Sequence, residues 1–178
     1  MRASRRLAGS AAQAEGHAEA LRRIAVRYAD ALRDLLGPSL VSVVLFGSVA
    51  RGDARAHSDI DLLVIVSDLP PGRLARQGLV GPADALLDPE LERLRRQAIL
   101  TDVNPILKTP EEVLRLPPLL LDLVEDAVVL HDRDGFFAGV LARLRESLAR
   151  LGARRVQRGW LRYWELKPDY LPGEVFEL

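Results

Sequence analysis

The sequence VVLFGSVARGD (residues 43–53), followed by SDIDLLV (residues 58–64), decides how this chain is expected to fold. The valine-rich run at 41–46 is typical of a buried strand, and the small, polar and charged residues at 47–58 are typical of a loop. The apolar run at 60–66 predicts a second strand. Two buried strands joined by a polar loop are therefore expected near the middle of the domain.

Helical and strand patterns alternate over the rest of the chain, which predicts a mixed α/β (α+β) class. Helices are expected at 21–35, at 73–97 with a break near Gly81-Pro82, at 119–125 and at 137–151, and a capping box at 109–112 should open a further short helix. Strands are expected at 99–107 and 127–130. Pro105 predicts that the strand at 99–107 lies at a sheet edge or contains a bulge. We divide the chain into a flexible N-terminus (1–16), one domain (17–152) and a C-terminal tail (153–178) that is rich in arginine and aromatic residues.

Composition excludes several classes of protein. The 178 residues carry 25 Lys plus Arg and 25 Asp plus Glu, and this zero net charge argues against a protein that coats nucleic acid through bulk positive charge. The chain has no cysteine, which excludes disulfides, thiolate zinc sites and cysteine nucleophiles. The most apolar run, 116–130, contains two prolines and three acidic residues, so no membrane span is expected. These features predict a cytoplasmic protein.

Two aspartates at the start of the second strand are candidate metal ligands. Asp59 and Asp61 are two residues apart, and side chains with this spacing point to the same face of a strand. Two carboxylates at such a short distance repel each other unless a cation lies between them. A site built only from oxygen ligands favours Mg²⁺ or Mn²⁺.

Candidate phosphate-binding residues lie at the end of the first strand. Gly47 allows the backbone to approach a ligand closely, and the Ser48 hydroxyl with nearby N–H groups can donate to phosphate oxygens. Arg51 adds a cation, and Ser58 directly precedes the aspartates, so both are assigned to nucleotide binding. Phosphate donors on one strand end beside two metal-binding carboxylates on the next are the arrangement that phosphoryl transfer needs.

This Gly-Ser, ten-residue, Asp-x-Asp pattern resembles the signature of the nucleotidyltransferase superfamily that includes DNA polymerase beta, and above all its minimal stand-alone members. The resemblance covers roughly residues 40–108 and rests on FGSVARG (46–52) and SDIDL (58–62). It implies a mixed sheet flanked by helices, two magnesium ions, and transfer of a nucleoside monophosphate, here AMP from ATP or another nucleoside triphosphate, to an acceptor hydroxyl.

The family often supplies a third carboxylate from a later strand. Asp102 is the candidate here, both as metal ligand and as catalytic base. Asn104 lies two residues further on and should share its face. If the register instead places Asn104 at the third position, the site lacks its usual base.

The sequence leaves the acceptor open. The resemblance implies that the acceptor is an antibiotic, an RNA end or a protein side chain. It also implies that minimal members often accompany a helical RNA-cleaving toxin, which some of them silence by attaching AMP. Two alternatives remain: a weakly catalytic or non-catalytic antitoxin that acts by contact, and a small-molecule nucleotidyltransferase of the antibiotic type. The arginines and aromatics of the tail fit nucleic acid or a packing surface, and zero net charge favours packing or partner contact.

Overall fold

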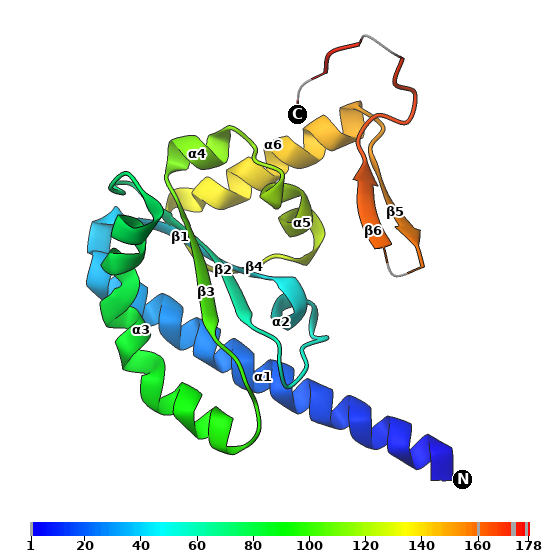
Figure 1. Cartoon of the computed structure of the whole chain (residues 1–178). Helices are drawn as coiled ribbons and strands as arrows, with labels where there is room; N and C mark the ends of the chain where they lie inside the picture. The colour runs from blue at the N-terminus through cyan, green and yellow to red at the C-terminus, as the bar shows by residue number, and fades with distance from the viewer. Residues whose placement is uncertain (1, 160, 172–173, 177) are drawn as a thin grey trace.

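The computed structural model describes residues 2–159, 161–171, 174–176 and 178, and folds them into three layers with a four-stranded sheet between two groups of helices (Figure 1). The helices are α1 (Arg2–Leu36), α2 (Gly47–Arg51), α3 (Arg73–Arg96), α4 (Pro110–Leu114), α5 (Leu119–Asp126) and α6 (Phe136–Arg150). The sheet contains β1 (Leu40–Phe46), β2 (Ile60–Val66), β3 (Val103–Lys108) and β4 (Val128–Asp132). A two-stranded hairpin, β5 (Arg154–Arg158) and β6 (Leu161–Glu165), follows α6.

The sheet has the strand order β3-β2-β1-β4 and is mixed, as expected. β1 pairs antiparallel with both β2 and β4, whereas β2 and β3 are parallel. The two inner strands are apolar on both faces because helices cover both sides of the sheet. Pro105 lies in β3, which is an edge strand, and an edge tolerates a residue without an N–H group.

Alternate residues of β2 face two separate cores. Ile60, Leu62 and Val64 pack with α1 and α3, whereas Leu63 and Ile65 pack with α4, α5 and α6. Between the helices of the first layer, the buried Tyr28 hydroxyl donates a 2.7 Å hydrogen bond to Asp84 Oδ1. This two-sided burial explains why the sequence predicts β2 over its observed span.

Several elements differ from the expectation. The segment at 47–58 is not entirely loop, because Gly47–Arg51 form the short helix α2. The helix α3 continues through Pro82 and Pro89 without the expected break, because an apolar stripe from Val80 to Leu94 is buried against α1 and offsets the missing hydrogen bonds. The capping box at Thr109 and Glu112 is confirmed.

The two ends of the chain also differ. Residues 2–16 belong to α1, although we expected a flexible N-terminus there, and the flexibility itself stays a prediction. The tail at 153–178 contains the β5–β6 hairpin, whose weak periodicity gave no strand signal. Within the part of the chain that the structure describes, none of the helices combines the length and apolar character needed to cross a membrane.

Candidate active site

Gly47 brings the end of β1 against the start of β2. Its φ is +74°, a left-handed conformation that glycine adopts without a steric penalty. A Cβ atom at this position would lie only 2.5 Å from Asp61 Oδ2, so no larger residue fits without moving that carboxylate. The register pairs Phe46 with Asp61 across the antiparallel ladder, which fixes the close approach. Gly47 therefore leaves the Asp61 carboxylate against bare backbone, as a site for a close ligand requires.

Asp59 and Asp61 flank the first residue of β2, and Asn104 of β3 lies beside them. The parallel register pairs Asp61 with Asn104 and Ile60 with Val103. The Asn104 amide donates to Asp59 Oδ2 at 3.2 Å, and the backbone N–H of Asp102 donates to Asp59 Oδ1 at the same distance. The structure thus brings the two predicted aspartates together and places Asn104, not a third carboxylate, next to them.

Asp102 occupies the start of this edge but turns its carboxylate elsewhere. Its Oδ1 accepts a 3.2 Å hydrogen bond from Arg95 Nη2 at the end of α3, and its side chain is 71% exposed. An ion pair between two such exposed groups contributes only about 0.2–1 kcal/mol. Rotation of Asp102 away from Arg95 is therefore inexpensive.

Burial and charge both act on Asp61. Partial burial raises the pKa of this carboxyl above its usual range, and the neighbouring Asp59 carboxylate raises it further. Hydrogen bonding by Asn104 and the positive charge of Arg51 oppose the shift without cancelling it. The deprotonated pair is thus held at an electrostatic cost that a bound cation would relieve.

The donor set fits a hard divalent cation only in part. Asp59 and Asp61 offer carboxylate oxygens, the ligands that Mg²⁺ and Mn²⁺ prefer. Within the described ranges, no group of three or more acidic or histidine side chains is placed to hold a metal ion. Oxygens of a triphosphate and water would therefore have to complete the coordination, as is usual for Mg²⁺.

The other predicted nucleotide-binding residues lie around the same loop. Ser48 is in the first turn of α2, and its carbonyl accepts the Asp53 N–H at 3.0 Å. Arg51, at the end of α2, lies 3.4 Å from Asp53 Oδ2 through Nε and 3.9 Å from Asp126 Oδ2 through Nη1. The Ser58 hydroxyl accepts the Arg55 N–H at 2.9 Å and supports the loop. Their contact with a nucleotide stays a prediction.

Arg22 of α1 positions α2 and carries no sequence signal for that role. Its Nε donates to the Val49 carbonyl at 3.1 Å, and its Nη2 donates to the Ala50 carbonyl at 2.7 Å. These carbonyls end a five-residue helix and have few partners of their own. Arg22 is one arginine on a helix with several, so only the contact distinguishes it.

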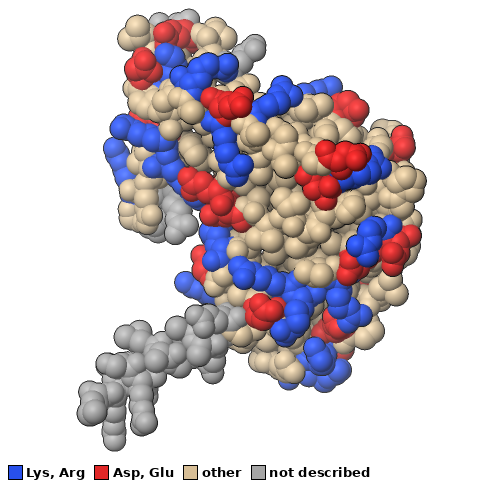
Figure 2. All heavy atoms as spheres, turned by 180° about the vertical axis from the view of Figure 1, so that it is seen from behind, with Lys and Arg blue, Asp and Glu red and all other residues tan. Residues whose placement is uncertain are grey.

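The C-terminal hairpin contacts α5, the helix whose last residue, Asp126, lies near Arg51. Trp164 Nε1 donates to the Leu121 carbonyl at 3.1 Å, and Trp164 packs on the core formed by α5 and α6. Arg155 pairs with Glu125 and lies 3.5 Å from Asp126 Oδ2, the same oxygen that Arg51 approaches. Part of the tail therefore packs on its own domain. On the face shown in Figure 2, basic and acidic side chains are interspersed.

Comparisons with known proteins show what this chain is similar to. The sequence model of a family described as nucleotidyltransferase domain matches residues 26–131. A candidate protein adenylyltransferase of Methanocaldococcus jannaschii is 35% identical over 117 residues, which are 65% of this chain and 74% of that protein. A spectinomycin 9-adenylyltransferase of Staphylococcus aureus is 33% identical over 79 residues, which are 39% of this chain and 30% of that protein. A crystal structure of a toxin–antitoxin with AMP-PNP is 23% identical, with a TM-score of 0.44, and the match covers 71% of this chain and 90% of that one.

Proposed function

The chain belongs to the nucleotidyltransferase domain family, and we propose that it transfers AMP from ATP, with Mg²⁺ or Mn²⁺, to a hydroxyl group of a partner protein. The observation that carries the proposal is the contact region of β1 and β2, where Asp61, with Asp59 two residues before it, lies against Gly47, a position that leaves no room for a side chain. Two like charges held together there are best explained by a site that is completed by a metal-bound nucleotide.

Different residues of the site would bind the metal ion and the phosphates of the nucleotide. Asp59 and Asp61 would hold the metal ion, which when bound neutralises triphosphate charge and orients the α-phosphate. Gly47 and Ser48 would place backbone N–H groups and a hydroxyl against the phosphates. Arg51, already held near Asp126, supplies a further positive charge on the same side. Ser58 is kept as a nucleotide contact that would have to leave its bond with the Arg55 N–H.

The transfer step balances as a single displacement. The acceptor hydroxyl oxygen forms a bond to the α-phosphorus, and the bond from that phosphorus to the bridging oxygen breaks. Pyrophosphate leaves with the electron pair, and the hydroxyl proton must pass to a base. Asn104 cannot take it, so we assign this role to Asp102 after its carboxylate rotates away from Arg95. This assignment rests on the low cost of breaking an exposed ion pair.

A protein acceptor fits this chain better than a small molecule. The match to the spectinomycin enzyme covers 30% of that protein, so the chain spans less than a third of a small-molecule relative. The match to the candidate protein adenylyltransferase covers 74% of its length. A helical RNA-cleaving toxin is the specific acceptor that the sequence resemblance favours, and it stays to be tested, as does the cytoplasmic location.

One observation favours a second function, in which the chain neutralises its partner by contact and transfers AMP slowly. Asn104, not a carboxylate, is the β3 side chain beside Asp59 and Asp61, and an amide neither accepts a proton nor binds Mg²⁺ strongly. Under this hypothesis the nucleotide stabilises the surface that binds the partner, and AMP transfer does not contribute to neutralisation.

Labelling separates the two functions. The purified chain, MgCl₂ and ATP radiolabelled at the α-phosphate are added to a lysate and to the co-purified partner, and labelled protein is identified by mass spectrometry. A protein that gains the mass of AMP with the wild-type chain, but not with Asp59→Asn, supports transfer. ATP binding without any labelled product, together with tight partner binding, favours the contact function.

A further inference from the structure

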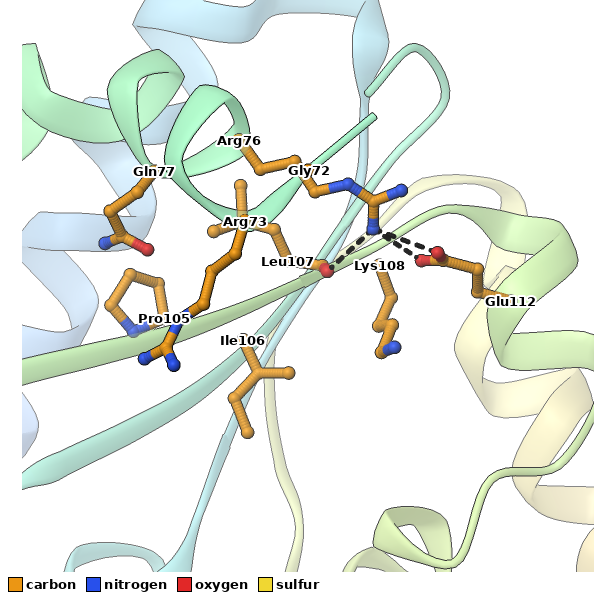
Figure 3. Close-up of a pocket in the computed structure, with 9 residues that line it drawn as sticks. All are labelled: Gly72, Arg73, Arg76, Gln77, Pro105, Ile106, Leu107, Lys108 and Glu112. Atoms are coloured by element: carbon orange, nitrogen blue, oxygen red, sulfur yellow. Dashed lines mark hydrogen bonds and ion pairs between the residues drawn. The ribbon is translucent and has the colours of Figure 1, made fainter. Parts of the chain in front are cut away.

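A cavity of about 610 Å³ lies between the start of α3 and the edge strand β3, outside the site described above (Figure 3). On the strand side it is lined from Pro105 to Lys108, so it begins at the residue after Asn104. Side chains alternate along a strand, and Asn104, Ile106 and Lys108 therefore share one face. We call the cavity, with Arg73 on its helical side, the edge groove. At about 3.3 Å per residue, it leads about 13 Å away from the aspartates.

The edge groove contains two positively charged side chains that are not held as Arg76 is, although the charge of Lys108 also acts on Glu112. Arg76 is fully engaged, because its Nη1 donates to Glu112 Oε2 at 2.8 Å and its Nε donates to the Pro70 carbonyl at 2.9 Å. Arg73 and Lys108 have no hydrogen bond or ion pair with any side chain that the structure describes. In Figure 3 the Lys108 side chain extends to the same side of β3 as Ile106, and the Arg73 side chain extends from α3 toward the strand. An occupant of the groove should therefore carry negative charge.

The groove also offers features that suit a polypeptide. Ile106 is 37% exposed on the face that it shares with Asn104, which gives an apolar contact between the charges. Among the described residues β3 pairs with β2 alone, so carbonyl groups of its other edge are available to an extended segment, whereas Pro105 has no N–H group to donate. The Leu107 carbonyl already faces this edge, where Arg76 Nη1 approaches it at 3.4 Å. None of the described residues that line the groove is aromatic, which disfavours stacking of RNA bases.

We propose that the edge groove binds an extended acidic segment of the protein acceptor. The segment lies along β3, with an Asp or Glu at Lys108 and Arg73 and a hydroxyl-bearing residue about four positions away, beside Asp59 and Asp61. The spacing follows from the separation of four positions between Asn104 and Lys108. The inference rests on the proposed function for the identity of the hydroxyl, whereas the charge preference of the groove stands independently of it.

Fluorescence anisotropy with synthetic peptides tests the groove without nucleotide. The probes are two labelled peptides, Tyr-Ser-Gly-Ser-Asp-Glu and its reverse, each with a neutral twin that carries Asn-Gln in place of the acids. We expect the wild-type chain to bind at least one acidic peptide about tenfold more tightly than its twin, because two exposed ion pairs each contribute a few-fold. The double variant Arg73→Glu, Lys108→Glu should lose this preference.

A matched variant controls for net charge. Arg93→Glu with Arg143→Glu makes the same charge change at two exposed arginines away from the groove, and it should keep the preference. Equal binding of acidic and neutral peptides by the wild-type chain would overturn the proposal. An equal loss of the preference for the acidic peptide in both double variants would also overturn it. Binding of a labelled single-stranded RNA that depends on Arg73 and Lys108, without peptide binding, would assign the groove to RNA and also overturn it.

Transfer assays distinguish failure of the groove from failure of the enzyme. With MgATP, tyrosine labelling should show a several-fold lower KM for a peptide with its acid four positions away than for one with its acid two positions away. Acidic peptide binding without any AMP transfer would leave the groove intact and contradict the proposed function. If the double variant Arg73→Glu, Lys108→Glu transfers AMP to a protein acceptor as fast as the wild-type chain, the proposed function stands and the groove proposal is contradicted.

Discussion

β2 and β3 lie side by side in parallel, and they differ in how strongly the sequence specifies them. β2 is an inner strand whose side chains are buried on both faces, and its observed span, Ile60–Val66, is the span that the sequence predicts. β3 has one neighbour, contains Pro105 and begins at Val103, four residues later than expected. Burial on two faces fixes where β2 begins, whereas one pairing partner and a half-exposed face leave the limits of β3 to tertiary contacts.

The difference matters because each strand supplies part of the site. Asp61 lies on β2 and Asp59 directly precedes it, and the antiparallel register pairs Asp61 with Phe46 at the end of β1. β3 decides which polar side chain joins them, and the register selects Asn104 while Asp102 pairs with Arg95. The aspartates proposed to bind metal thus lie at the start of the well-specified strand, and Asp102, the residue proposed to accept the proton, directly precedes the weakly specified one.

The largest expected effect lies on β2. Asp59→Asn and Asp61→Asn should each lower the rate of AMP transfer by about 10³-fold or more, because charge developing on the phosphates loses its compensation. The measurement is single-turnover transfer from MgATP to the labelled acceptor, with circular dichroism to show that the fold is kept. A variant that retains most of its rate would remove its aspartate from the metal site.

A somewhat smaller effect is expected where β1 meets β2. Gly47→Ala places a Cβ atom 2.5 Å from Asp61 Oδ2 and should lower the transfer rate by about 100-fold, since a displacement of about 1 Å has that cost. Gly152→Ala is the matched control, because its φ is also positive, at +65°, and nothing lies within 4 Å of the added atom. Both variants should lose stability through backbone strain, but only Gly47→Ala should lose rate. Equal rates would contradict the close approach.

The sequence predicts the site to the extent that local pattern specifies it. Gly47, Ser48, Asp59 and Asp61 are identified because strand alternation and one short spacing bring them together. Arg22 acts across 27 residues of sequence on the Val49 carbonyl, and such a contact depends on how α1 packs, which periodicity does not encode. The hairpin was missed for a related reason, since Trp164 is held by a carbonyl of α5. The nucleotide and metal roles of the site residues stay predictions.

At Asp102, directly before β3, the expected effect is about 100-fold and confined to turnover. Asp102→Asn should lower kcat by this amount, in the range that loss of a general base causes. Nucleotide affinity should change much less, because Asp59 and Asp61 still hold the metal-bound triphosphate. The readouts are kcat at saturating acceptor and the Kd for MgATP. Arg95→Ala, which frees Asp102, should leave kcat unchanged or slightly higher.

Full activity of Asp102→Asn would show that the proton passes elsewhere. Asn104→Asp then becomes the informative variant, because it adds a carboxylate at the position that the register places beside Asp61. A gain in Mn²⁺ affinity without nucleotide, measured by calorimetry, would show that β3 limits the metal site.

The smallest effect is on stability, and it compares the two strands directly. Burial and the Asp59 charge raise the pKa of Asp61, so the folded protein holds the deprotonated carboxylate at a cost that the unfolded chain does not have. In metal-free buffer at pH 7.5, Asp61→Asn should therefore raise the Tm by a few degrees, since about 1 kcal/mol corresponds to about 2–4 °C at this size. Asn104→Ala should lower the Tm, because the Asn104 hydrogen bond opposes the rise in pKa.

The pH dependence of the rise in Tm tests whether it comes from removal of the Asp61 charge. The raised pKa means that wild-type Asp61 becomes protonated in the folded state as pH falls, while the unfolded chain still holds it ionised. The advantage of Asp61→Asn should therefore be largest above the folded pKa, shrink as pH falls through it, and vanish below the ordinary value of 3.8. Thermal melts at pH 7.5, 5.5 and 4.5 measure the trend. An advantage that grows toward acid pH, or a destabilised variant at pH 7.5, would show that the Asp61 carboxylate on β2 stabilises the metal-free fold and is not held there at a cost.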